Sequence, residues 1–202
     1  MLRLVAIAAR LWFYKNWMYA GLIAALFLCA VLPLFAGGWS VGLLAVYLML
    51  PGYMLHQVEE HAGDRFRRYV NRQVLHVPDA LTTLAVVMIN VPLVWGVFLA
   101  ALYLARFVGL GWGLIAVYSM LVNALLHIAA AIVRRGYNPG LATAVILFLP
   151  LSVWGLATIG AAPGVTAVQQ GIGLAVGVLI HVAIIVHVRR RVTMLKESAA
   201  GT

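Results

Sequence analysis

Residues 19–61 read YAGLIAALFLCAVLPLFAGGWSVGLLAVYLMLPGYMLHQVEEH, which is two long apolar runs on either side of Gly37 and Gly38. The first run covers residues 19–36 and the second covers residues 39–61. Each has close to the roughly 20 apolar residues that a helix needs to cross the hydrocarbon core of a bilayer. Paired glycines favour a turn. The stretch therefore predicts two membrane-spanning helices joined by a short loop.

Four more apolar runs follow, at residues 81–105, 112–133, 141–159 and 167–188. Turn signals separate them, with Gly and Pro at 109–111, 138–140 and 162–164. The chain is 65% apolar and 9% charged, whereas about a quarter of the residues in a soluble domain are charged. These values exclude a soluble domain and a disordered chain. We therefore expect an all-α polytopic membrane bundle, in which residues 1–202 form a single transmembrane domain of six helices.

Residues 1–17 differ from the six runs because Arg3, Arg10 and Lys15 alternate with Leu, Trp and Phe. The uncharged stretch between the two arginines is too short for the core of a signal peptide. Basic and aromatic residues mixed in this way are typical of an amphipathic helix that lies in the membrane interface. We predict a short interfacial helix here; the alternative is a basic extension of the first span.

The basic residues indicate the orientation. With six spans, 13 of the 14 Lys and Arg residues fall on one side: the N-terminus, the 62–80 and 134–140 connections, and the C-terminus. Arg106 is the exception. Because cytoplasmic loops are enriched in basic residues, both termini are predicted to be cytoplasmic. A topological origin for the net charge of +9 also removes the reason to expect a nucleic-acid partner.

Four of the five acidic residues lie at the end of the second span or between it and the third, and two of them follow a histidine in His56-Gln57-Val58-Glu59-Glu60. Residues three and four positions apart share a helix face, so His56, Glu59 and Glu60 are predicted to form one stripe. Charged groups in hydrocarbon are costly unless they have a partner. The partner is either an arginine, such as Arg65 or Arg68 in a structural ion-pair network, or a bound metal ion.

Two more histidines are expected at a similar depth. His127 lies six residues before the end of the fourth span, and His181 lies eight residues before Arg189. At a rise of 1.5 Å per residue, both lie about 9–14 Å below the cytoplasmic surface, as His56 does. We predict that His56, Glu59, Glu60, His127 and His181 converge as metal ligands. The residues expected to support them or to contact substrate are Asn123, Asn90, Asp64, His61 and Asn138.

The motif, His127 after Asn123, the segment 137–141 and the late His181 together resemble the HXXEE family of small bacterial integral membrane proteins. This resemblance implies a multi-pass protein of the bacterial cytoplasmic (inner) membrane. The function of that family is uncharacterised. Its histidines and glutamates imply a metal-dependent enzyme.

Three classes of function fit these residues. The first is an intramembrane metallohydrolase that acts on a lipid or other apolar small molecule, with one glutamate as ligand and Glu60 as general base. The second is a di-iron oxidoreductase, although His-x-x-Glu reverses the usual Glu-x-x-His order. The third is a metal- or proton-coupled transporter or a scaffold, although no internal repeat is found. One or two divalent ions, zinc or iron, are expected in the first two classes. Homo-oligomerisation is left open.

Overall fold

A computed structural model describes the backbone of residues 2–200 and the side chains of residues 12–200. Nine α-helices and five shorter 3-10 or π elements make up this part of the chain, which contains no strand. The helices are α1 (Leu2–Phe35), α2 (Val41–His61), α3 (Arg65–Tyr69), α4 (Thr83–Met88), α5 (Gly96–Phe107), α6 (Leu114–Arg134), α7 (Leu141–Thr143), α8 (Leu149–Gly160) and α9 (Ala167–Ala200). The shorter elements are η1 (Ala62–Asp64), η2 (Val70–Val74), η3 (Ile89–Trp95), η4 (Leu110–Gly113) and η5 (Ala144–Phe148).

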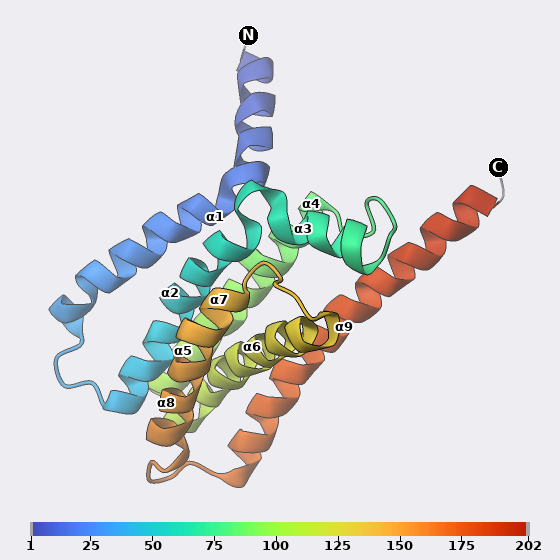
Figure 1. The fold of residues 1–202 in the computed structure, drawn as a ribbon. Coiled ribbons are helices and arrows are strands. Elements are labelled where there is room, and N and C mark those ends of the chain that lie inside the picture. Colours follow the sequence, from blue (N-terminus) through green and yellow to red (C-terminus); the bar gives the residue numbers. More distant parts are fainter. Residues whose placement is uncertain (1, 201–202) are drawn as a thin grey trace.

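Six helical segments are long and apolar enough to cross a membrane, which confirms the predicted all-α bundle of six spans. The segments are Trp12–Phe35, Val41–Val74, Thr83–Phe107, Leu110–Arg134, Leu141–Gly160 and Ala167–Ala200. Figure 1 shows them leaning side by side, with the beginning of α1 and the end of α9 toward the same end of the bundle. An even number of crossings accounts for this arrangement.

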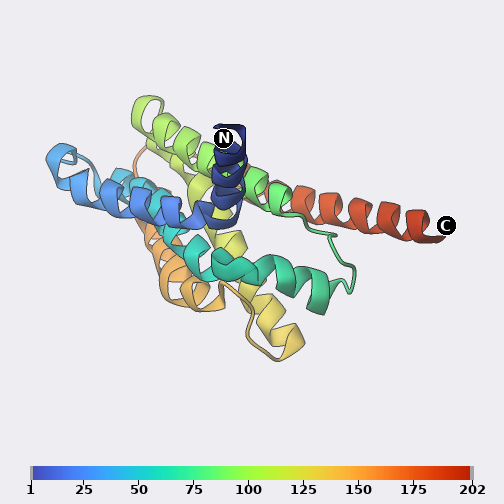
Figure 2. The ribbon, with the colours of Figure 1, turned by 90° about the horizontal axis from the view of Figure 1, so that it is seen from above.

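Helix α1 contains both the first span and almost all of the predicted interfacial segment. It is continuous from Leu2 to Phe35, and its N-terminal part bends away from the bundle (Figures 1 and 2). Met1 lies outside the described residues. That residues 1–17 lie in the membrane interface stays a prediction.

Close packing of α6 against α9 depends on small residues. A Cβ atom at Gly173 would lie 2.9 Å from the backbone of Leu114, and one at Gly177 would lie 3.0 Å from the backbone of Ser119. Small residues four positions apart let two membrane helices approach closely. This contact places His181, one turn beyond Gly177, beside α6.

A sharp turn ends α2 on the side that carries the functional motif. Gly63 and Asp64 both have positive φ, at 63° and 62°, and the chain then turns into α3 and η2. The buried Asn71 fixes the connection that follows, since it donates to Leu81 O at 2.9 Å and accepts from Leu81 N at 2.8 Å. The turn holds α3 and η2 across the end of the bundle, over the histidines described next.

Three of the short elements are π-helical: η2, η3 and η5. Such wide turns inside helices occur often at functional sites because they shift side chains out of the α-helical register. In η3, Pro92 lacks the N–H that an α-helix would use. The π segments place Asn90 and Phe148 toward the interior, where both are buried.

Candidate metal centre

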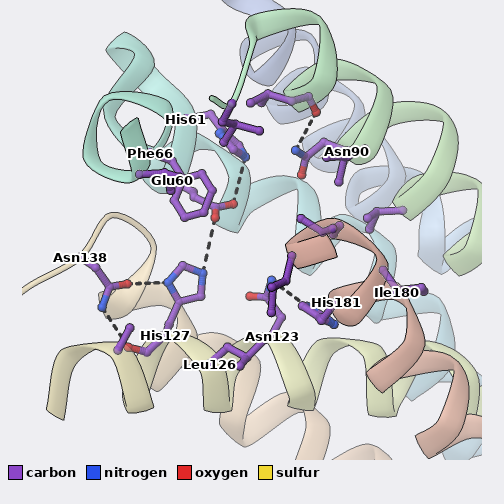
Figure 3. A pocket seen from close by; sticks show the side chains of 18 of the residues that line it. Glu60, His61, Phe66, Asn90, Asn123, Leu126, His127, Asn138, Ile180 and His181 are labelled. Atoms are coloured by element: carbon purple, nitrogen blue, oxygen red, sulfur yellow. Dashed lines mark hydrogen bonds and ion pairs between the residues drawn. The ribbon is translucent and has the colours of Figure 1, made fainter. Parts of the chain in front are cut away.

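Three buried side chains from two spans meet inside the bundle: His56 and Glu60 of α2 and His127 of α6. One ligand atom from each lies within 4.8 Å of the other two. His56 Nε2 lies 3.5 Å from Glu60 Oε2, and His127 Nε2 lies 3.5 Å from Glu60 Oε1. Figure 3 shows Glu60 directed toward His127. Two imidazoles and one carboxylate thus face a common point.

Hydrogen bonds to the other ring nitrogens orient both imidazoles. His127 Nδ1 lies 2.6 Å from Asn138 Oδ1, and Asn138 Nδ2 donates to His127 O at 2.9 Å (Figure 3). An amide oxygen only accepts, so His127 Nδ1 carries the hydrogen. His127 Nε2 is the ring nitrogen that faces Glu60, 3.5 Å from Oε1.

His56 is held in the same way through a hydroxyl. Its Nδ1 lies 2.7 Å from Thr143 Oγ1, while the Thr143 hydroxyl donates to Glu59 Oε2. Because the hydroxyl hydrogen is used on Glu59, Thr143 accepts from His56 Nδ1. His56 Nε2, buried and without a hydrogen bond, is left as a free acceptor. Partners of this kind orient metal-bound imidazoles and raise their basicity.

Gly140 packs directly against both rings. A Cβ atom built on it would lie 2.7 Å from His127 Cε1 and 2.8 Å from His56 Cε1. Its φ of 99° is also one that residues with a side chain rarely adopt. Only glycine fits here, at the N-cap of the fifth span.

The two glutamates of the motif point to different places. Glu59 is partly exposed, and its carboxylate accepts hydrogen bonds from the Tyr137 hydroxyl, from Ala142 N and from Thr143 N. The two backbone groups belong to the first turn of the fifth span, where helices lack internal acceptors and favour a negative charge. Glu59 therefore ties α2 to α7 and keeps Thr143 beside His56. Burial and the hydrogen bond to Glu59 raise the pKa of Tyr137, so its phenol stays a donor at neutral pH.

His61 lies closer to Glu60 than its place on the helix predicts. Its Nε2 is 3.0 Å from Glu60 Oε2, although the angle does not make a hydrogen bond and the nitrogen has no other partner. Consecutive residues of a helix point about 100° apart, so His61 would ordinarily face away from Glu60. His61 is the last residue of that helix, with φ of −109°, and its ring is held between Trp17 and Phe66.

A cavity of about 360 Å³ opens beside this group, between α2, α3, α6, α9 and the π segments η2 and η3. Glu60, His61 and His127 form part of its wall, and so do Asn123 and His181. His181 is not one of the three clustered ligands, and instead lies 3.5 Å from Asn123 Nδ2. Most of the other lining side chains are apolar, among them Val70, Val94, Leu126, Ile180 and Ile184.

The remaining predicted residues lie around the group. Asn138 contacts His127, as described, and Asn90 lines the cavity and accepts from Gln57 Nε2 at 2.9 Å. Asp64 instead pairs with Arg67 near the surface. Arg65 and Arg68 bond to backbone carbonyl groups. Among residues 12–200, the ionisable side chains close to the Glu60 carboxylate are therefore histidines alone, and the alternative ion pair with arginine does not form.

Three residues of the site were not identified from the sequence as functional. Thr143 orients His56, Gly140 makes room for both imidazoles, and Gln57 joins α2 to η3 through Asn90 and Trp95. The signal for Thr143 is its place three residues after a turn glycine, at the start of a helix, where hydroxyl groups commonly bond to neighbouring groups. The signal for Gln57 is an amide side chain within an apolar helix. Such a side chain needs hydrogen-bond partners when it is buried, as Gln57 is.

The model of a known family matches residues 47–155, more than half of the chain. That family is described as proteins of unknown function with an HXXEE motif, and the chain belongs to it. The motif is formed by His56, Glu59 and Glu60. No curated protein and no solved structure matches the chain at a significant level.

Proposed function

We propose that this member of the HXXEE family is an intramembrane metal-dependent hydrolase with one divalent ion, which acts on a lipid or another apolar small molecule. The observation that carries the proposal is the buried group His56, Glu60 and His127, in which His56 Nε2 has no hydrogen-bond partner and both imidazoles place Nε2 3.5 Å from an oxygen of the carboxylate. Two His and one Glu are a ligand set of catalytic zinc sites.

The spacing of these atoms fits a metal ion. Two ligands at about 2.1 Å from a tetrahedral ion lie about 3.4 Å apart. Each imidazole Nε2 lies 3.5 Å from one oxygen of the Glu60 carboxylate, His56 from Oε2 and His127 from Oε1. Charge supports the same assignment. The Glu60 carboxylate is buried without Lys or Arg beside it, and a buried charge needs compensation. A divalent cation supplies that compensation.

The cavity supplies the remaining requirements of a hydrolase. A bound ion lowers the pKa of a water ligand and polarises a carbonyl group. The cavity beside Glu60 leaves room for both, and its apolar wall suits a hydrocarbon substrate. We assign His61 as proton acceptor, because its Nε2 has no hydrogen-bond partner and lies 3.0 Å from Glu60 Oε2, at the wall of the cavity. Water oxygen bonds to the carbonyl carbon, its proton passes to His61, and the departing oxygen or nitrogen takes that proton as its bond to carbon breaks.

The separation of the glutamates favours this proposal over a carboxylate-bridged di-iron centre. Such centres use several carboxylates in the bundle core. In the part of the chain with described side chains, the clustered ligands include Glu60 as their one carboxylate, while Glu59 holds the start of the fifth span. We assign Glu60 as ligand and Glu59 as positioning residue.

The location follows from topology. We propose that the protein spans the bacterial inner membrane with both termini in the cytoplasm, because six spans put 13 of 14 basic residues on one side. The metal centre then lies in the cytoplasmic half of the bundle, near the end of α2.

Metal content of purified protein tests the proposal. Wild-type protein should contain about one equivalent of zinc, iron or another divalent metal by elemental analysis. Glu60→Gln should lose it, since an amide is a neutral and weaker ligand. Glu59→Gln should keep a larger share, because it acts through Thr143. Glu197→Gln, at an exposed position of α9, is the matched control and should keep all of it. Wild-type protein without metal that gains no thermal stability from added zinc, iron or manganese contradicts the proposal.

A further inference from the structure

We propose that Asn123 and His181 form a second polar subsite in the cavity, which accepts a hydrogen bond from an O–H or N–H group of the substrate. The substrate class is then a long-chain molecule that carries a hydrogen-bond donor near its reactive group, such as a hydroxylated ester or a secondary amide. This inference rests on the proposed function in taking the cavity as the substrate chamber, but the contacts themselves do not involve the metal ligands.

Asn123 supplies the acceptor atom of the subsite. Its Nδ2 donates to the Tyr53 hydroxyl at 3.2 Å, which fixes the orientation of the amide. Its Oδ1 is buried and has no hydrogen-bond partner. Nearly all buried polar atoms in proteins have a partner, and an orphaned one destabilises the fold. Since Asn123 lines the cavity, a ligand there is the missing donor.

His181 orients the Asn123 amide from the other side. Its Nδ1 lies 2.7 Å from Gly177 O, one turn earlier on α9. A carbonyl oxygen only accepts, so Nδ1 carries the hydrogen, and Nε2 of the neutral ring is an acceptor. This nitrogen lies 3.5 Å from Asn123 Nδ2, and Figure 3 shows the two side chains together, beside the His127 and Glu60 pair. His181 Nε2 therefore accepts from Asn123 Nδ2, and Asn123 Oδ1 is the open acceptor of this wall.

The apolar side chains of the cavity indicate the chemistry of the rest of the ligand. Leu126 of α6 and Ile180, Ile184 and Ile185 of α9 line the cavity on either side of the Asn123 and His181 subsite. Ligand pockets are mostly apolar, with a few polar groups that fix orientation. A hydrocarbon chain fits the apolar wall. The polar end of the ligand then binds at two places: an acceptor atom of the ligand at the metal centre, and a donor group of the ligand at Asn123.

A pair of probes isolates the donor. We would measure the thermal midpoint of metal-free protein in lipid nanodiscs against the mole fraction of 1-dodecanol or of dodecyl methyl ether. The two probes have the same chain, and only the alcohol donates. A hydrogen bond worth about 1.4 kcal/mol is a tenfold change in binding. The alcohol should therefore reach half of its full effect at about one tenth of the mole fraction that the ether needs.

Variants assign the effect to residues. Asn123→Leu should remove the preference for the alcohol, whereas His56→Ala should keep it, because His56 does not contact the subsite. Equal effects of alcohol and ether in wild-type protein overturn the inference without reference to any variant. An alcohol preference that survives in Asn123→Leu overturns it as well. If wild-type protein binds no metal but still prefers the alcohol, the subsite is supported and the hydrolase proposal fails. Failure of one proposal is therefore distinguishable from failure of the other.

Discussion

Replacing Gly140 by Ala should disable the metal centre through a contact that lies outside the ligand set. The new methyl group would lie 2.7 Å from His127 Cε1 and 2.8 Å from His56 Cε1, where ordinary contacts begin at 3.4 Å. Each ring must therefore withdraw by about 0.7 Å, or the backbone at residue 140 must shift by as much. Metal–ligand distances tolerate only about 0.2 Å.

Two separate costs follow from this substitution. Alanine at a positive φ costs roughly 1–2 kcal/mol of stability. Displacement of the imidazoles adds a loss of metal affinity, about 10- to 100-fold when groups that orient ligands are changed. Gly164→Ala separates the two costs, because Gly164 has a similar φ of 81° with no atom within 4 Å of the new Cβ.

The assay is metal titration of detergent-purified apoprotein, with thermal unfolding measured in parallel. Both variants should unfold at a lower temperature than wild type. Only Gly140→Ala should bind metal more weakly. If Gly140→Ala binds metal as wild type does, or if Gly164→Ala loses affinity equally, then close contact at residue 140 does not position the two imidazoles and the reasoning fails.

Two further predictions concern the frame around the centre. Gln57→Leu should lower the free energy of unfolding by about 2 kcal/mol without changing metal affinity, because it orphans Asn90 Oδ1 and Trp95 Nε1 but leaves the histidines in place; chemical denaturation with a metal titration checks both. A fluorescent protein fused after Thr202 should fluoresce in bacterial cells. Alkaline phosphatase should be active only when it is inserted on the opposite side, as in the 161–166 connection, and an active alkaline phosphatase fused after Thr202 contradicts the topology.

The six spans are predictable because length and hydropathy decide membrane insertion locally. The pairing of His56 with Glu60 is predictable too, since residues four apart share a helix face. The place of Glu59 is not, although it also falls on that stripe. Its partners are the first N–H groups of the fifth span, more than 80 residues away, and only the packed bundle brings them within reach. The place of the His61 ring beside Glu60 is not predictable either, because it depends on where α2 ends.

The site is assembled from distant parts of the chain, and this sets an order for its biogenesis. His56 and Glu60 enter the membrane with the second span, His127 with the fourth, and Thr143 with the fifth, 87 positions after His56. During synthesis, the hydrogen bond that orients His56 can therefore form only after the fifth span has been made. Helix α9 contributes Ile180 and His181 to the cavity and none of the three clustered ligands. A nascent chain that ends before α9 thus already holds every group of the candidate metal centre, while the cavity beside it still lacks one wall.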